Sequence, residues 1–171
     1  MAEALTLRTA MLLEMDDEES RTLRTLERVP QERWDWSPHE KSTPMGRLGA
    51  HIATLPQIAV GILTTTEFDM VANRGALLPP PAAAADLVPV AQARFHEARK
   101  ALEAATDADL QGDWTFRFGD QVMFGPGPRV VALRTFFLSH IIHHRGQLGV
   151  YLRLCGVPVP STSGPSADEP R

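Results

Sequence analysis

Apolar residues recur every three to four positions along most of the chain, which is the spacing of one face of an α-helix. The first such segment, about 3–28, carries Leu5, Leu12, Met15, Leu23 and Leu26. Another segment, about 87–106, carries Ala91, Phe95, Ala98, Leu102 and Ala105. Asp86 is the predicted N-cap of this second helix, and Pro30 lies just beyond the end of the first.

Two further helical segments have histidines within their apolar lines. The first begins at Pro44, with Thr43 as its N-cap, runs to about Thr65, and should be kinked by Pro56. Its line consists of Leu48, His51, Leu55, Ile58 and Ile62. The second, about 129–155, has the line Leu133, Phe137, His140, His144, Leu148 and Tyr151, with Gly156 predicted at C′. Both lines are predicted to face the core.

The remaining segments favour connections between these helices. Residues 77–85 are rich in Pro and Ala and predict an extended connection. Residues 114–124 alternate around Gly119-Asp120, which indicates a short hairpin. The sequence therefore predicts an all-α four-helix bundle over residues 1–158, with a short β-like excursion before the last helix. The polar residues 159–171 are predicted to form a disordered tail.

Composition narrows the class of protein. A hydrophobic content of 43% with 22% charged residues is typical of a globular protein, and the net charge of −4 argues against nucleic-acid binding. The single cysteine, Cys155, excludes an intramolecular disulfide and a cysteine-based zinc site. No apolar stretch approaches a membrane span and no signal peptide is apparent, so a cytoplasmic location is expected. The acidic run 16–19 is interpreted as a solvated helix face.

The three histidines carry the candidate chemistry. His140 and His144 stand four residues apart, on one helix face, and His51 occupies the equivalent position on another helix. Polar side chains on a core-facing line need partners, and three imidazoles converging from two helices are well suited to a divalent metal, zinc or nickel. A hydrogen-bonded core histidine is the alternative for each residue alone. His143 lies off the central line and is interpreted as a flanking or second-shell residue.

The neighbours of these histidines leave alternatives open. Arg145 and Gln147 could support the ligands or contact a substrate; alternatively, Arg145 pairs with an acidic residue on another helix. The three tryptophans, Trp34, Trp36 and Trp114, could line a pocket mouth or cap the end of the bundle. No fourth ligand is evident, which predicts an open coordination position able to acidify a bound thiol or water. No general base is evident either.

Several of these residues together resemble the DinB/YfiT-like superfamily. The resemblance rests on the element His140-x-x-x-His144-Arg-Gly-Gln, on Leu48-Gly-Ala-His51-Ile and on Trp36-Ser-Pro, and it extends over residues 5–158. It implies a four-helix bundle, frequently dimeric, in which one histidine of the second helix and two of the fourth bind a divalent metal. By this resemblance the ligands would be His51, His140 and His144.

The resemblance also implies a class of reaction. The superfamily includes S-transferases that use bacillithiol, mycothiol or glutathione, so a metal-dependent transfer of such a thiol to a small electrophile is the expected function. The partners expected are a small-molecule substrate, a low-molecular-weight thiol and a second copy of the chain. A non-catalytic metal-binding protein of stress or damage response, or a metal-dependent hydrolase, is the alternative.

Overall fold

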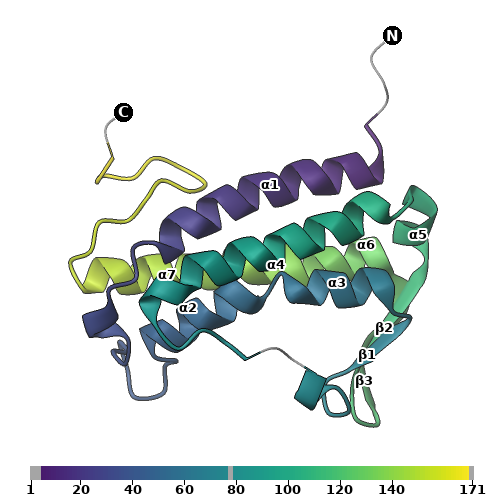
Figure 1. Ribbon diagram of the computed structural model, residues 1–171, viewed down its shortest axis with the longest axis horizontal. Coiled ribbons are helices and arrows are strands. Elements are labelled where there is room, and N and C mark those ends of the chain that lie inside the picture. The colour runs from purple at the N-terminus through teal and green to yellow at the C-terminus, as the bar shows by residue number, and fades with distance from the viewer. Residues whose placement is uncertain (1–4, 77–78, 170–171) are drawn as a thin grey trace.

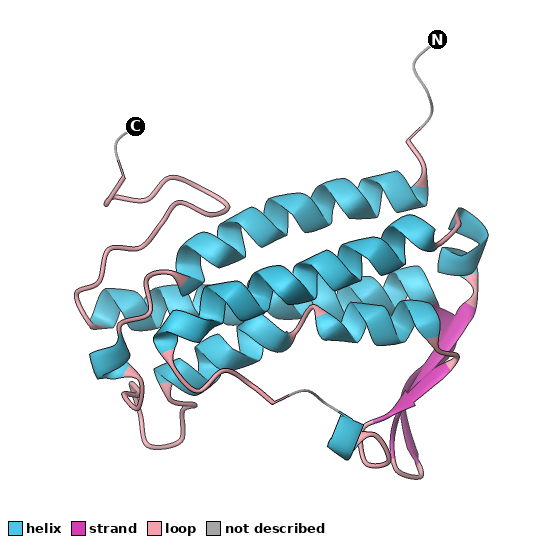
Figure 2. Ribbon diagram, in the orientation of Figure 1, coloured by secondary structure: helices cyan, strands magenta, loops and turns pink. Residues whose placement is uncertain are grey.

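The computed structural model describes residues 5–76 and 79–169 of the 171-residue chain. The long helices lie side by side along the long axis of the molecule, and a small sheet covers one end of them (Figure 1). Figure 2 shows that helix dominates and that strands are confined to this end. The fold is thus mostly helical with a small sheet. Among the described residues, no helix is both long enough and apolar enough to cross a membrane.

Helix α1 (Leu7–Leu26) packs on α4 and α7. It begins at Thr6, whose side chain accepts a hydrogen bond of 3.1 Å from the Thr9 amide, so the helix is N-capped. Met15 and Leu26 are fully buried, whereas Leu5 lies exposed before the helix starts. The predicted range began at residue 3, and residues 3 and 4 lie outside the described part of the chain.

The predicted helix 44–65 is divided into α2 (Met45–Thr54) and α3 (Gln57–Thr64). The division falls at Leu55-Pro56, because proline has no amide hydrogen to bond the preceding turn. The predicted kink is therefore a break between two helices. The predicted cap at Thr43 is wrong by one residue: Pro44 occupies the N-cap position, without a side-chain hydrogen bond.

Helix α4 (Ala84–Ala104) begins three residues before the predicted start, and its N-cap is Ala83 rather than Asp86. A residue far away in the sequence explains the difference. The Ala84 amide donates a 2.8 Å hydrogen bond to the side chain of Gln31 in the short helix η1 (Gln31–Arg33), which supplies the cap. The predicted apolar line is buried in α4 at Ala91, Phe95, Ala98 and Leu102 and at its C-cap, Ala105, and Leu87 extends it by one turn.

The predicted hairpin is present and belongs to a three-stranded sheet of the described residues. Strands β2 (Asp113–Phe118) and β3 (Gln121–Pro128) pair antiparallel, and β1 (Glu67–Asp69) pairs parallel with β2. Strand β1 shows no pattern in the sequence, because a three-residue strand has too few positions for an alternation. The single-turn helix α5 (Asp107–Gln111) and the short helix η2 (Arg74–Ala76) were likewise not predicted. Of the predicted connection 77–85, residues 77 and 78 lie outside the described part.

The predicted helix 129–155 consists of α6 (Arg129–Ala132), the π-helical segment η3 (Leu133–Leu138) and α7 (Ser139–Leu154). A π-turn holds more residues than an α-turn and so advances the apolar line by one position. From Leu138 onward the fully buried line of α7 is Ile141, Arg145, Leu148 and Leu152. Gly156, at φ +72°, follows the helix as predicted, since glycine adopts this conformation without strain.

The C-terminal segment has no helix or strand, but it contacts the helices up to Glu169. Arg153 of α7 forms an ion pair of 2.5 Å with Asp168, and Arg24 of α1 pairs with Glu169. The Val159 amide also donates to Asp168, over 2.8 Å. This packing differs from the expected disorder. The contacts are made by polar side chains, so a low apolar content did not indicate them.

Candidate metal centre

Two helices bring His51, His140 and His144 together, as the sequence predicts. His51 lies in the last turn of α2, and the other two lie in the first turns of α7. The Nε2 atoms of His51 and His140 are 3.3 Å apart, and those of His140 and His144 are 2.9 Å apart. One ring nitrogen from each of the three lies within 4.8 Å of the others. This cluster could bind a metal ion.

The cluster lies at the edge of the core and not within it, which corrects the predicted buried line. His51 is exposed, and His140 and His144 are half-buried. The next residues along each helix, Ile52 and Ile141, are fully buried instead. One residue corresponds to a rotation of about 100° around a helix, so a shift of one position moves a side chain from the core to its rim. In α7 this shift follows from the π-segment η3.

In His140 and His144, the Nε2 atom faces the cluster and the Nδ1 atom lies at the rear of the ring. Hydrogen bonds at Nδ1 determine which nitrogen of each ring carries the proton. The Nδ1–H of His140 donates to the Phe136 carbonyl over 3.4 Å, because a carbonyl can only accept. The Nδ1–H of His144 donates to the side-chain oxygen of Gln147 over 2.7 Å. A neutral imidazole protonated on Nδ1 has a lone pair on Nε2. Two lone pairs therefore face each other across 2.9 Å, an arrangement that a cation between them would stabilise.

The rings favour the neutral form. Loss of hydration in the surrounding protein, together with the charges of the nearby His144 and His140 rings, lowers the pKa of His51 to about 4. Burial is also the main cause of the lowered pKa of His140, followed by the charge of His144. Although one side of His51 faces solvent, the two neighbouring rings crowd the other side. Neutral imidazoles are the form that metals bind, so protons compete weakly here.

The spacing of the nitrogens suits a tetrahedral ion. Nitrogen ligands about 2.0–2.1 Å from zinc in a tetrahedral arrangement are separated by about 3.3–3.4 Å. The separation of His51 and His140 matches this value, and that of His140 and His144 is a few tenths of an ångström shorter. A small rotation of one ring would close the difference. The three residues therefore fit a divalent metal by geometry, protonation and spacing.

The predicted neighbours of the triad separate into two groups. Gln147 contacts the rear of His144 directly, as an outer residue of a metal site would. His143 is exposed, with its ring centre 4.9 Å from that of His144, on the flank of the cluster. Arg145 lies on the fully buried line of α7 and takes no part in the cluster.

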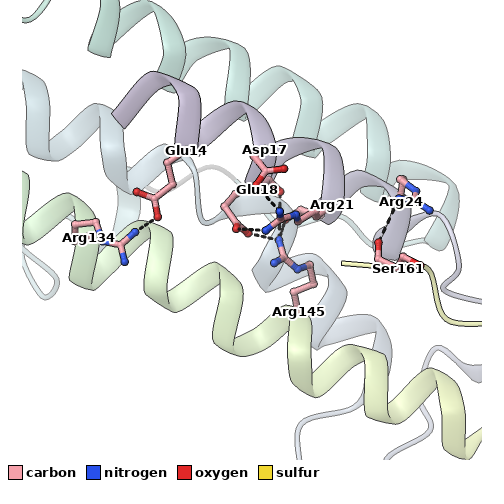
Figure 3. A network of polar contacts seen from close by, with 9 residues as sticks. Glu14, Asp17, Glu18, Arg21, Arg24, Arg134, Arg145 and Ser161 are labelled. Atoms are coloured by element: carbon pink, nitrogen blue, oxygen red, sulfur yellow. Dashed lines mark hydrogen bonds and ion pairs between the residues drawn. The ribbon is translucent and has the colours of Figure 1, made fainter. Parts of the chain in front are cut away.

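Arg145 pairs with Glu18 of α1, which decides between the two interpretations of this arginine (Figure 3). Its guanidinium also donates to the Thr22 hydroxyl over 3.2 Å, and both members of the pair are almost fully buried. Arg21 donates to the other carboxylate oxygen of Glu18 over 3.1 Å. The solvated face expected for residues 16–19 is therefore wrong at Glu18, because a buried charge on α7 needs a buried counter-charge.

An apolar cavity of about 480 Å³ adjoins the triad, and His51 and His140 form part of its wall. The other walls come from α2, α3, the sheet and the segment after η2, including Leu55, Ile58, Phe68, Met70, Pro80 and Trp114. Trp114 is fully buried and donates from its indole to the Thr65 hydroxyl over 3.3 Å. The sequence left open whether Trp114 lines a pocket or caps the end of the bundle, and in the structure it lines the cavity. One side of the triad thus faces a space large enough for a small molecule.

Other residues of the cavity were not foreseen from the sequence. Phe68 and Met70 reach it through β1, and Arg74 reaches it from η2. The alternation of 114–124 indicated the hairpin, but nothing local indicated that a segment almost fifty residues earlier pairs with it. Only the parallel register of Phe68 opposite Phe116 brings these side chains beside the triad.

Comparison with known proteins agrees with this architecture. A solved DinB-like protein from Bacillus cereus is 24% identical, with a TM-score of 0.69, and the match covers 93% of this chain and 99% of that one. A DinB-like protein from Bacillus subtilis is 19% identical, with a TM-score of 0.65, over 94% and 99% of the two chains. At these identities the likeness establishes the fold. No curated protein matches the chain significantly. The family model described as the DinB family matches residues 1–171, and the chain therefore belongs to the DinB family.

Proposed function

We propose that His51, His140 and His144 bind a divalent metal ion, zinc or nickel, and that the protein is a metal-dependent enzyme. The observation that carries this proposal is the apolar cavity beside the triad, whose wall includes His51 and His140. A purely structural site would more often be enclosed and have four protein ligands. Three histidines at the rim of the core leave room for a ligand from the cavity side.

The residues of the chain would prepare this site for a nucleophile. When bound by three neutral imidazoles, a divalent ion keeps its full charge and lowers the pKa of a coordinated thiol or water. The Phe136 carbonyl and Gln147 keep the rear nitrogens of His140 and His144 protonated, which directs both lone pairs forward. Trp114 and Ile58 give the adjoining cavity an apolar wall.

The reaction that we propose is thiol transfer to a small electrophile. A low-molecular-weight thiol such as bacillithiol, mycothiol or glutathione would lose its proton to solvent. Its sulfur would then form a bond to an electrophilic carbon, and the leaving group would depart with the electron pair of the broken bond. The nucleophile has to come from a cosubstrate, because Cys155 lies at the C-cap of α7 and does not line the cavity.

A non-catalytic role is the second candidate, and one observation favours it. No carboxylate lines the cavity within the part of the chain that the structure describes, so an acid or base for proton transfer is not provided there. A metal-binding protein of stress or damage response needs no such group. Hydrolysis by activated water would need it more than thiol transfer does, since a thiolate requires no further deprotonation.

We also propose that α2–α3 and α6–η3–α7 each act as one long helix, so that together with α1 and α4 they form a four-helix bundle.

Exposed leucines on α1, Leu7 and Leu13, favour a homodimer that covers this helix. A cytoplasmic location agrees with the use of low-molecular-weight thiols. Sedimentation at micromolar concentration tests the dimer, and Leu13→Gln should shift it towards monomer.

The function is tested by loading the protein with zinc or nickel and measuring thiol addition to model electrophiles such as monochlorobimane. Each of the three thiols is assayed with wild-type protein, with metal-free protein and with His51→Ala. We expect turnover that requires metal and that is lost in His51→Ala. Stoichiometric metal without turnover for any thiol would favour the non-catalytic role.

A further inference from the structure

The cavity beside the triad contains an arginine without a counter-charge. Among the described residues that line the cavity, Arg74 is the one arginine, and no lysine, aspartate or glutamate lies beside it in the wall. The other lining residues are mostly carbon-rich, and the hydroxyl of Thr54 is already bonded to the Ala50 carbonyl over 3.0 Å. Arg74 is exposed, so it places a solvated cation at the border of an apolar space.

The carboxylates nearest to Arg74 along the chain have other partners. Glu67 pairs with Arg117 across the sheet, over 3.3 Å. One oxygen of Asp69 accepts from the Gly119 amide over 2.9 Å and from the Val71 amide over 2.8 Å, and these hydrogen bonds lower the pKa of Asp69. Within the described ranges, no side chain forms an ion pair with Arg74. Its guanidinium is thus available to a ligand in the cavity.

We propose that this cavity binds a small molecule with an apolar body and one terminal carboxylate, and that Arg74 binds the carboxylate. The proposal rests on the proposed function and specifies the electrophilic substrate. The planar guanidinium matches a carboxylate with two parallel hydrogen bonds, and about 480 Å³ accommodates a small organic acid. The apolar walls, including Ile58, Phe68 and Trp114, fit the body of such an acid better than they fit a polar thiol cosubstrate.

Binding is tested with octanoate and with octanol, which has the same chain length and no charge. Titration calorimetry of the metal-free full chain removes direct coordination of the carboxylate, and zinc-loaded protein is measured in parallel. We expect octanoate to bind about tenfold more tightly than octanol, as for a hydrogen-bonded ion pair at a partly exposed site. Arg74→Gln should abolish this preference, Arg74→Lys should keep part of it, and Arg28→Gln, on the surface elsewhere, should leave it unchanged.

A second pair of variants tests whether the ligand occupies this cavity. Gly61 lines it, and a Cβ added there meets nothing within 4 Å, so α3 tolerates a side chain at this position. Gly61→Leu should weaken both ligands, whereas Gly61→Ala should change little. Equal affinity for octanoate and octanol, or a preference that survives Arg74→Gln, would overturn the proposal.

Kinetics separate this inference from the function itself. If octanoate binds through Arg74 but no thiol reacts, the binding site stands and the transferase is rejected. If thiol transfer occurs, Arg74→Gln should raise KM for carboxylate-bearing electrophiles at least several-fold and leave neutral ones unaffected. A change in KM for the thiol alone would assign Arg74 to the cosubstrate and overturn the inference.

Discussion

At the scale of single residues, the protonation of the imidazoles decides what the cluster can do. His140 and His144 direct bare Nε2 atoms forward only because their Nδ1 protons are held at the rear by a carbonyl and by Gln147. Outer contacts of this kind orient metal ligands and raise their basicity. The residues around a ligand therefore contribute measurably to the affinity of the site.

The neighbours of His144 should differ in their effect on metal binding. His144→Ala is expected to abolish stoichiometric binding of zinc, and Gln147→Ala to weaken it about 10- to 100-fold. His143→Ala should leave affinity nearly unchanged, because this side chain lies on the flank of the cluster. Competition with a chromophoric chelator measures all three. Loss of metal in His143→Ala comparable to that in His144→Ala would assign the ligands differently.

The buried pair of Glu18 and Arg145 should dominate the stability of the contact between α1 and α7. Glu18→Ala leaves a buried guanidinium without compensation and is expected to cost about 3–5 kcal/mol in the free energy of unfolding. Glu14 also lies on α1, and its carboxylate forms a solvent-exposed ion pair with Arg134 of η3. Glu14→Ala removes this pair and should cost at most about 1 kcal/mol in the free energy of unfolding. Urea unfolding compares the two variants. If Glu18→Ala does not fold, Glu18→Gln provides the same comparison, and equal costs would contradict the expectation.

At the scale of elements, the interruptions of the helices position the site. The break at Leu55-Pro56 ends α2 one turn after His51, and the residues beyond it turn along the cavity in α3. In the last helix, η3 moves the apolar line by one position, which places Arg145 in the core and the histidines at its rim. The two interruptions have different effects: the π-segment precedes His140 and His144 and changes which face of α7 is buried, whereas the break follows His51 and sets the direction of α3 along the cavity.

The C-terminal segment should release from the helices in acid. Arg153 and the Val159 amide hold the pKa of Asp168 at about 2, and Arg24 and the Ser161 amide do the same for Glu169. A lowered pKa means that the contacts stabilise the docked segment above the ordinary pKa of these groups and that this is lost as the pH falls towards 2. NMR titration of the side-chain carboxyls is the measurement. Arg153→Ala should return the pKa of Asp168 towards its ordinary value and leave that of Glu169 low; an ordinary pKa for Asp168 in the wild type would contradict the docking.

At the scale of the whole molecule, the triad joins α2 to α7, and its two parts are 89 residues apart in the sequence. A ligand that binds only the folded chain stabilises it by an amount that rises with the logarithm of the ligand concentration divided by the dissociation constant. Zinc at 100 times its dissociation constant should add about 2.7 kcal/mol, which raises Tm by about 5–10 °C for a chain of this size. Calorimetric scans with and without zinc measure the shift. His51→Ala should show none, and a shift retained in that variant would place the ion elsewhere.

The sequence alone predicted the helical segments, the hairpin and the three histidines that come together in one cluster. Each of these depends on local order: a period of 3.6 along Ala91 to Ala105, an alternation around Gly119, and two histidines four residues apart. The resemblance to the DinB family, which rests on short motifs around Trp36, His51 and His140, is confirmed by the family match over residues 1–171. Local periodicity does not fix the phase of a line to better than one residue, however, and this is why the predicted depth of the triad was wrong.

Only the tertiary structure decided which partners distant residues have. Glu18 is one of four consecutive acids, and its selection as the partner of Arg145 depends on how α1 crosses α7. Gln31 caps α4 and β1 pairs with β2 through contacts that leave no local pattern. The cavity beside His51 and His140 is formed by segments from α2 to β2, so its shape and the placement of Arg74 at its wall arise only when these segments pack. Pairing between distant segments depends on the sum of many weak contacts across the fold, so it cannot be predicted from any single segment of the chain.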